Sequence, residues 1–417
     1  MSNFTPHTIR LQDGSLCNLN KRITRSSPTL LSLLESIPDP RKKQGRRHSA
    51  ALILFIVFVA LLRGSKDLKD AHLFALLHQR FFQIKLGLDM PHGIPDPTTI
   101  SRLLGRLDPN QLVRIYLKFL QALGVSLGDV NVMSYDGKTM CAVGGKAATR
   151  HILSFFSHDS HLALGQVGVE GKGREIPAFE QLLKQGNDHD LVVGKLLLGD
   201  ALHTQKATVK AILKVNADYL FVVKGNQRQL GREIATVLAA AEASTDRARL
   251  DQFTYKDTKR KRNVTTTITV LRADPSATSR PQELLPRLTR SNHWDGVTTI
   301  GTLHRTGTRI RKDGTVHEIE ETIGFISSRR LTAEAVGTHL RKHWCIENNL
   351  HWTKDVVFAE DKHTLRRGNA PQVMSWLRSM CISLCNALNL QSISDTIHNL
   401  EKSTGLLEQF LKMAAVI

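Results

Sequence analysis

The stretch Val130-Asn-Val-Met-Ser-Tyr-Asp-Gly137 marks the point where helical periodicity gives way to alternation. Apolar and polar residues alternate through Tyr135, which predicts a β-strand, and Asp136-Gly137 is a typical strand terminator. Further strands are expected at 151–158, 162–169, 195–199 and 219–223, with helices at 177–184 and 203–215. This order of three strands, then helix, strand, helix and strand predicts an α/β fold.

The rest of the chain divides into segments of different character. Residues 1–27 form a polar, irregular tail, and 28–128 a basic helical N-terminal domain. The α/β core begins in 129–244, and 245–328, rich in Thr and Val, is a mainly β insertion. Helical pattern resumes in the core segment 329–369 and continues in the C-terminal helices of 370–417.

The composition points to a polyanionic partner. The 417 residues include 57 Lys+Arg and 38 Asp+Glu, which gives a formal net charge of +19, and 41% hydrophobic residues are enough for packed cores. A basic run in the N-terminal domain is a candidate for binding DNA ends, with a structural cap on the next domain as the alternative. Its cations are Arg41, Lys42, Lys43, Arg46 and Arg47.

Several classes of protein are disfavoured. The most apolar stretch, 50–62, is shorter than the roughly 20 residues of a membrane-spanning helix and predicts a buried core helix. No signal peptide is recognised, and the five scattered cysteines predict reduced thiols in the cytosol without a zinc site. Walker A, G-x-S-x-G and H-E-x-x-H motifs are absent from the sequence. The basic run 259–262 fits a solvated part of the insertion better than a phosphate-contacting ridge.

Two aspartates lie at the carboxyl ends of predicted strands. Asp136 follows the first strand and Asp200 the fourth, and in open α/β sheets such strand ends collect ligands and metals. A third carboxylate, Glu347, lies on the helix after the insertion. At 100° per residue one face of that helix would carry Leu340, His343, Glu347, His351 and Lys354.

Three carboxylates suit phosphodiester chemistry. Two Mg²⁺ ions would activate the attacking oxygen and neutralise the leaving one, and Mg²⁺ prefers oxygen ligands. Purely structural roles remain open for each residue: Asp136 as a strand terminator, Asp200 as a helix cap, and Glu347 in a surface ion pair with Lys354. His203, three residues after Asp200, is a candidate phosphate contact or a polar first-turn residue.

These motifs resemble the H-repeat-associated group of bacterial insertion-sequence transposases of the DDE type. The similarity spans roughly 28–390. Compared with the wider insertion-sequence superfamily, Leu340 stands in place of a tyrosine and His343 in place of an arginine. Compared with the H-repeat-associated group itself, Cys141-Ala142 stand in place of the usual Arg-Gly. The resembling blocks are Pro38-Asp-Pro-Arg41, Asp136-Gly-Lys-Thr139, Asp200-Ala-Leu-His-Thr-Gln205, Asp218-Tyr219, Lys224-Gly-Asn-Gln227, His343-Trp-Cys-Ile-Glu-Asn348 and Leu350-His-Trp352.

The resemblance implies a ribonuclease-H-like catalytic core interrupted by the β insertion. Asp136, Asp200 and Glu347 would form the catalytic, metal-binding triad for Mg²⁺, with Mn²⁺ as a substitute. Asp136 would bridge the two metals, while Lys354 and His343 would contact phosphate beside the scissile bond.

The implied activity is cleavage at the 3′ ends of the element's terminal repeats in double-stranded DNA, followed by strand transfer. A homodimer on paired ends, in the bacterial cytoplasm and on the nucleoid, would perform it. Rival hypotheses are a nuclease on the same core and a decayed, non-enzymatic DNA-binding remnant. An RNA scaffold is disfavoured, since aromatic residues are only 6% of the chain.

Overall fold

The computed structural model describes residues 8–10, 16–18, 27–44, 46–140, 151–169, 174–243, 250–258, 262–273, 294–311, 313–362, 364–390 and 392–417. Cys141, Ala142 and residues 259–261 of the basic run lie outside these ranges. The chain forms two compact units, which we describe separately. Unit 1 comprises Met1–Val130, Gly137–Gln185 and Ile346–Ile417, and unit 2 comprises Asn131–Asp136 and Gly186–Cys345.

Unit 1 opens with two short antiparallel strands, β1 (Thr8–Arg10) and β2 (Leu16–Asn18), so the predicted irregular tail contains regular structure. The predicted helices follow. Ser49 caps α2 by accepting a hydrogen bond from the Leu52 N–H, and all residues of α2 are buried. The prediction of a buried core helix is therefore confirmed. The helices are α1 (Leu30–Glu35), α2 (Ala50–Leu62), α3 (Leu68–Leu77), the π-helix η1 (Phe81–Lys85), α4 (Pro97–Leu104), α5 (Pro109–Ala122) and the short η2 (Leu127–Asp129).

The C-terminal helices of unit 1 share a core with these N-terminal helices. The long α12 (Ala370–Ala387) packs against α2, α4 and α5, and the Leu30 N–H donates to the Ala415 carbonyl at 2.9 Å. No helix among the described residues is long and apolar enough to cross a membrane. The remaining elements are β4 (His151–Ser157), β5 (Ala163–Val169), α6 (Glu175–Asn187), α11 (Trp352–Val356), η8 (Glu360–Lys362), α13 (Ile393–Lys402) and α14 (Thr404–Met413).

Unit 2 is built on a large mixed sheet in the order β3-β6-β7-β11-β10-β9-β8. The first three strands are parallel, and β11 and the strands beyond it pair antiparallel. Parallel strands require crossover connections, which here include α7 (Lys206–Lys214) between β6 and β7. The strands are β3 (Val132–Thr139), which continues into unit 1, β6 (Leu196–Gly199), β7 (Asp218–Val223), β8 (Leu250–Asp257), β9 (Arg262–Arg272), β10 (Thr299–Ile310) and β11 (Val316–Ser327).

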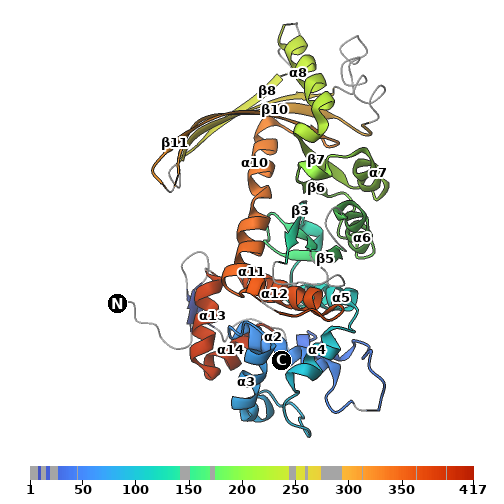
Figure 1. Cartoon of the computed structure of the whole chain (residues 1–417), viewed down its shortest axis with the longest axis vertical. Helices are drawn as coiled ribbons and strands as arrows, with labels where there is room; N and C mark the ends of the chain where they lie inside the picture. The colour runs from blue at the N-terminus through green and yellow to red at the C-terminus, as the bar shows by residue number, and fades with distance from the viewer. Residues whose placement is uncertain are drawn as a thin grey trace. The chain divides into compact units, whose positions relative to one another are not determined.

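The predicted β insertion extends this sheet rather than standing apart from it. Residues 220–223 of β7 pair with 324–327 of β11, so the insertion satisfies the backbone groups of an otherwise open edge. Two helices sandwich the extension: α8 (Arg228–Glu242) packs on β10 and β11, and α10 (Ala333–His343) packs on β8 and β9 from the opposite face (Figure 1). The core of unit 2 includes Leu198, Ile268, Phe325 and Val336.

Candidate functional site

Asp136 and Asp200 follow the paired residues of two neighbouring parallel strands of unit 2, β3 and β6. The register pairs Val132 with Leu196 and Ser134 with Leu198, and the same separation of 64 residues relates Asp136 to Asp200. Parallel neighbours in register lie about 4.8 Å apart and direct their side chains to the same face of the sheet. Asp136 and Asp200 each lie two residues beyond Ser134 and Leu198, the last paired residues of the two strands.

Strand β3 does not end at Tyr135 as predicted. It runs on to Thr139, so Asp136 lies within the strand and the interpretation of Asp136-Gly137 as a terminator is wrong. The strand continues because Lys138, in spite of its charge, is buried and bound by carboxylates of unit 1. Asp136 itself is partly buried.

Asp200 is a helix N-cap, which was the alternative interpretation of this residue. Its Oδ1 accepts a hydrogen bond from the Leu202 N–H at 3.0 Å and caps the short helix η3 (Ala201–His203). This helix is separate from α7, so the predicted helix at 203–215 is wrong over its first three residues. The Asp200 residue is exposed, so capping by one carboxylate oxygen leaves the other available to a ligand.

Strands β3 and β6 pack tightly against each other at the residues that precede Asp136 and Asp200. A Cβ on Gly199 would lie 2.4 Å from the Tyr135 ring, so only glycine allows the ring to pack against β6. The His203 ring meets Tyr135 edge-on at a centroid distance of 4.8 Å. Burial and the charge of Asp200 raise the pKa of Tyr135 well above its usual value, which keeps the phenol neutral.

His203 packs against Tyr135, an enclosure that does not favour the predicted phosphate contact, which stays a prediction. Its side chain is 2% exposed, and burial lowers its pKa in spite of the nearby Asp200 charge. A neutral, enclosed imidazole offers phosphate neither charge nor access.

His343 links the end of α10 to the aspartate-bearing strand. Its Nδ1 lies 2.7 Å from the Ser134 Oγ. Burial lowers the pKa of His343 to about 4, against the opposing charge of Asp200, so the ring is neutral at pH 7. This side chain positions α10 against β3, and its predicted phosphate contact stays a prediction.

Glu347 lies on a π-helical turn, η7 (Ile346–His351), at the start of the last part of unit 1, and is exposed. A π-turn uses i→i+5 hydrogen bonds and shifts the side chains that follow out of α-helical phase. The predicted single face is therefore wrong: Glu347 is exposed whereas Lys354 is buried. Because Lys354 is buried, the alternative role of Glu347 in a surface ion pair with Lys354 is also wrong.

Lys354 belongs to the interior of unit 1. Its Nζ donates to the Ser375 Oγ at 3.0 Å, its side chain is 1% exposed, and burial lowers its pKa to about 8. This enclosure does not fit the predicted contact with DNA phosphate. The ammonium group instead joins a set of charged groups that we call the buried charge network: Lys138, Lys354, Asp355, Glu360, Asp361 and Arg378.

Two cations hold the buried charge network together. Lys138 Nζ lies 2.6 Å from Asp355 Oδ1 and 2.9 Å from Asp361 Oδ1. Arg378 Nη1 lies 3.4 Å from Glu360 Oε1, and both side chains have no exposed surface. Burial alone would raise the pKa of Glu360, but the charges of Lys354, Arg378 and Lys138 lower it to about 2.

Sequence reasoning missed this network. One signal was available: Arg378 is the single charged residue within the apolar stretch 370–387, and a charge on a buried helix needs a partner. Asp355, Glu360 and Asp361 follow Glu347 in the sequence and are naturally taken for surface residues. Their role appears only when Lys138 is brought to them by the fold.

The basic run of the N-terminal helices contains both structural and exposed cations. The Arg41 guanidinium binds Asp39, with Nη2–Oδ2 at 2.7 Å, and also donates to the His48 carbonyl. Arg46 donates to the backbone carbonyls of Asp39 and Arg41. These two arginines therefore build the loop. The other three cations, which we call the exposed basic trio, are Lys42, Lys43 and Arg47, and all three are exposed.

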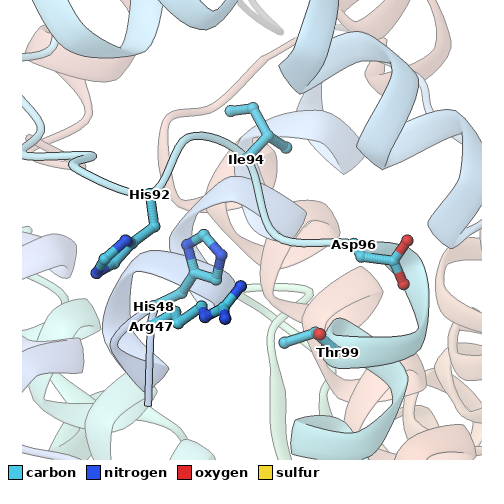
Figure 2. Close-up of a pocket in the computed structure, with 6 residues that line it drawn as sticks. All are labelled: Arg47, His48, His92, Ile94, Asp96 and Thr99. Carbon is cyan, nitrogen blue, oxygen red and sulfur yellow. The ribbon is translucent and has the colours of Figure 1, made fainter. Parts of the chain in front are cut away.

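A pocket of about 350 Å³ opens beside this loop. Figure 2 shows Arg47, His48 and His92 clustered on one side and Asp96 and Thr99, at the start of α4, on the other. Burial, followed by the charges of His92, Arg41 and Arg47, lowers the pKa of His48. The pocket is thus lined by polar groups of both signs.

The described residues contain no group of three His, Cys, Asp or Glu side chains placed to hold a metal ion. Asp136, Asp200 and Glu347 therefore form no such group, although carboxylate oxygens are the ligands that Mg²⁺ prefers. Asp218, the other acid in this part of the sheet, is occupied, since Arg329 Nε lies 2.9 Å from its Oδ2. Cys345, Cys381 and Cys385 are free thiols.

Comparison with known proteins defines the class. Residues 128–384 match the family described as "Transposase DDE domain", and 31–120 match the family described as "DDE_Tnp_1-associated". The chain therefore belongs to the DDE transposase domain family. This confirms the resemblance found in the sequence, and the family implies DNA as the partner and a divalent metal as the cofactor.

Its relatives carry matching names. The chain is 29% identical over 359 residues to the "H repeat-associated putative transposase YhhI" of Escherichia coli K12, covering 85% of this chain and 89% of that protein. It is 28% identical to the "Putative transposase YncI" of Escherichia coli O157:H7, with 86% and 87% covered. The "Putative protein YbfL" of strain K12 is 29% identical, with 85% and 89% covered.

Proposed function

We propose that the chain is a DNA transposase that cleaves the terminal repeats of its own insertion sequence and joins the 3′ ends to target DNA. One observation carries the proposal: Asp136 and Asp200 each lie two residues beyond Ser134 and Leu198, the last paired residues of neighbouring parallel strands, and α/β sheets bind ligands at the carboxyl ends of such strands. Glu347 is proposed as the third carboxylate of the catalytic triad. Its exposure on the π-turn fits that role, because a metal ligand must be accessible.

A ribonuclease-H-like core is part of this proposal. The parallel strands β3, β6 and β7 and the antiparallel pair β4–β5 support it, with helices following β5 and β6. We assign DNA-end binding to the exposed basic trio. We also infer a homodimer on paired ends, acting on the bacterial nucleoid, from the sequence resemblance.

Each residue has a defined task in this mechanism. Bound Mg²⁺, or Mn²⁺ in its place, would activate the attacking oxygen and stabilise charge on the phosphate. Asp136, Asp200 and Glu347 would hold it with carboxylate oxygens. The Gly199–Tyr135 packing fixes the two aspartates relative to each other, and His343, through Ser134, holds the end of α10 four residues before Glu347. Rigid elements of this kind preserve ligand geometry better than loops do.

The test is cleavage of DNA that carries the flanks of the element. Purified full-length protein with Mg²⁺ should cut at the element's ends, and Asp200→Ala should abolish cutting while retaining DNA affinity. Asp89→Asn is the matched control, because Asp89 is an exposed aspartate of unit 1 far from the triad in sequence. Capture of the cut ends by a plasmid distinguishes a transposase from a nuclease. DNA binding without cleavage, equal in the wild type and Asp200→Ala, would favour a non-enzymatic remnant and refute the proposal.

A further inference from the structure

Two arginines of unit 2 lie over aromatic rings where α10 ends. Arg305 Cζ, on β10, lies 5.2 Å from the centroid of the ring of Trp344, the C-cap residue of α10. Arg341 Cζ, in the last turn of α10, lies 4.9 Å from the centroid of the Tyr255 ring on β8. Both distances fall within the roughly 6 Å over which a guanidinium is attracted to a ring face. Each pair therefore joins α10 to a strand of the insertion.

The two pairs share one face of the sheet. Thr266 of β9 is directly opposite both Tyr255 and Arg305, and directly opposed residues point to the same face. Neighbouring strands lie about 4.8 Å apart, so the backbones of Tyr255 and Arg305, two strands apart, are separated by roughly 10 Å. The two guanidinium groups therefore belong to one surface of unit 2.

A second set of arginines lies further along the same strands. Arg262 of β9 is directly opposite Arg309 of β10, which is four residues from Arg305 and so on the same face. Like charges directly opposite one another destabilise a sheet. Asp257 offsets this charge only in part, since its Oδ2 lies 3.9 Å from Arg262 Nη1. An anionic ligand would relieve the repulsion between Arg262 and Arg309.

The geometry of the stacked arginines suits phosphate groups better than bases. Stacking on a ring leaves the in-plane N–H donors of a guanidinium available, and a planar guanidinium can bind two phosphate oxygens at once. Arg341 is exposed, and Arg305 is 24% exposed. The nearest approach of Arg305 Nη1 to Glu321 Oε2 is 3.8 Å, which is longer than a hydrogen bond. Each aromatic ring already holds an arginine, so it is less open to stacking by a base.

We propose that this surface of unit 2, which we call the stacked-arginine face, binds the phosphate backbone of double-stranded DNA. The inference rests on the proposed function, because it gives a protein that would act on DNA a second DNA contact besides the exposed basic trio of unit 1. Contacts to phosphate carry no sequence information, so this face would hold duplex DNA irrespective of its sequence. The face comprises Tyr255, Arg262, Arg305, Arg309, Arg341 and Trp344.

The experiment measures binding of the full-length protein to a fluorescent DNA duplex of unrelated sequence by anisotropy. Several salt concentrations are compared, with EDTA present to prevent cleavage. Each phosphate contact contributes about 0.9 to the slope of log affinity against log salt, so Arg305→Met with Arg341→Met should lower the slope by about 1.8. Arg341→Met alone, at an exposed position, covers the case in which the double variant fails to fold, and should lower the slope by about 0.9.

The matched control removes the same charge from the other side of the sheet. Arg228 and Arg232 are exposed arginines of α8, which packs on the face opposite α10. Arg228→Met with Arg232→Met should leave the slope unchanged. A slope equal to that of the wild type in the test variants, or an equal loss in the control, would overturn the proposal.

A charge-preserving variant separates stacked arginines from a plain basic patch. Arg305→Lys with Arg341→Lys keeps both positive charges, so the salt slope should persist. Affinity should nevertheless fall several-fold, because an ammonium group cannot bind two phosphate oxygens as a planar fork does. Affinity equal to that of the wild type would contradict the assigned role of the guanidinium groups.

Failure of the proposed function is a separate result. The wild type would then bind the duplex without cutting the element's ends in Mg²⁺, while the lowered salt slope of Arg305→Met with Arg341→Met would still be observed. Failure of this inference alone would leave cleavage at the element's ends intact and the slope of the test variants unchanged.

Discussion

Replacement of Arg378 by methionine should destabilise unit 1 by about 3–5 kcal/mol, because it leaves a buried carboxylate without its partner. Arg378 and Glu360 both have no exposed surface, and they meet at 3.4 Å. The buried charge network contains three cations and three carboxylates, so it is neutral as a whole. Arg378→Met leaves it with a net negative charge.

The magnitude depends on what remains around Glu360. Lys138 lies 3.9 Å from Glu360 Oε2 and would still offset part of its charge. Methionine also removes the hydrogen bond to the Lys66 carbonyl, whose loss costs about 1–3 kcal/mol if the acceptor stays buried. The remaining Lys138 charge lowers the cost of the substitution and the lost hydrogen bond raises it. The expected loss of unfolding free energy therefore stays within the range for a broken buried ion pair.

The assay is denaturant unfolding of the full-length protein in a double-mutant cycle. Glu360→Gln alone should also destabilise, whereas Arg378→Met with Glu360→Gln restores neutrality and should cost clearly less than the two single changes added together. A coupling energy of about 2 kcal/mol or more is expected. Additive effects, or single changes that cost less than about 1 kcal/mol, would refute the conclusion that this pair is a buried, mutually dependent unit.

Three further outcomes are expected. Burial lowers the pKa of His351 to about 3, so between pH 6.5 and 3 the unfolded chain binds the extra proton and stability falls as pH falls. His351→Gln should flatten the stability profile by up to about 1.4 kcal/mol per pH unit there, and an unchanged acid slope would contradict the assignment. Gly199→Ala should cost roughly 1–3 kcal/mol by thermal unfolding, since its Cβ would overlap the Tyr135 ring; unchanged stability would count against that packing. Alanine at all three positions of the exposed basic trio should weaken DNA binding and lower the salt slope by up to about 2.7; an equal slope in fluorescence anisotropy would exclude the trio from the interface.

The strands of this fold were predictable because their signal is local. Strand-like runs bounded by turn residues located β4, β5 and β7 to within about a residue, and β8–β11 lie in the segment predicted as a mainly β insertion. Strand neighbours are not a local property. The sequence placed Asp136 and Asp200 at strand ends, but the pairing of β3 with β6 joins residues that are 64 apart in the sequence.

The errors share a physical origin in long-range contacts. The helix around Glu347 was read with one period of 100° per residue, and the π-turn at 346–351 breaks that period. Lys354 and His203 carry polar groups that usually seek water, and they are buried because the tertiary fold supplies partners or packing. The Ser375 partner of Lys354 lies 21 residues further along the chain, and the Tyr135 partner of His203 lies on β3.

The shared register of β3 and β6 has a consequence for how this chain tolerates change in length. The relative position of the two aspartates is fixed by backbone pairing of 132–134 with 196–198, and not by the chain that joins these strands. A change in the length of the loop between α6 and β6 would therefore leave the pairing of these two strands intact. A single residue added inside either strand would instead turn one carboxylate to the opposite face of the sheet.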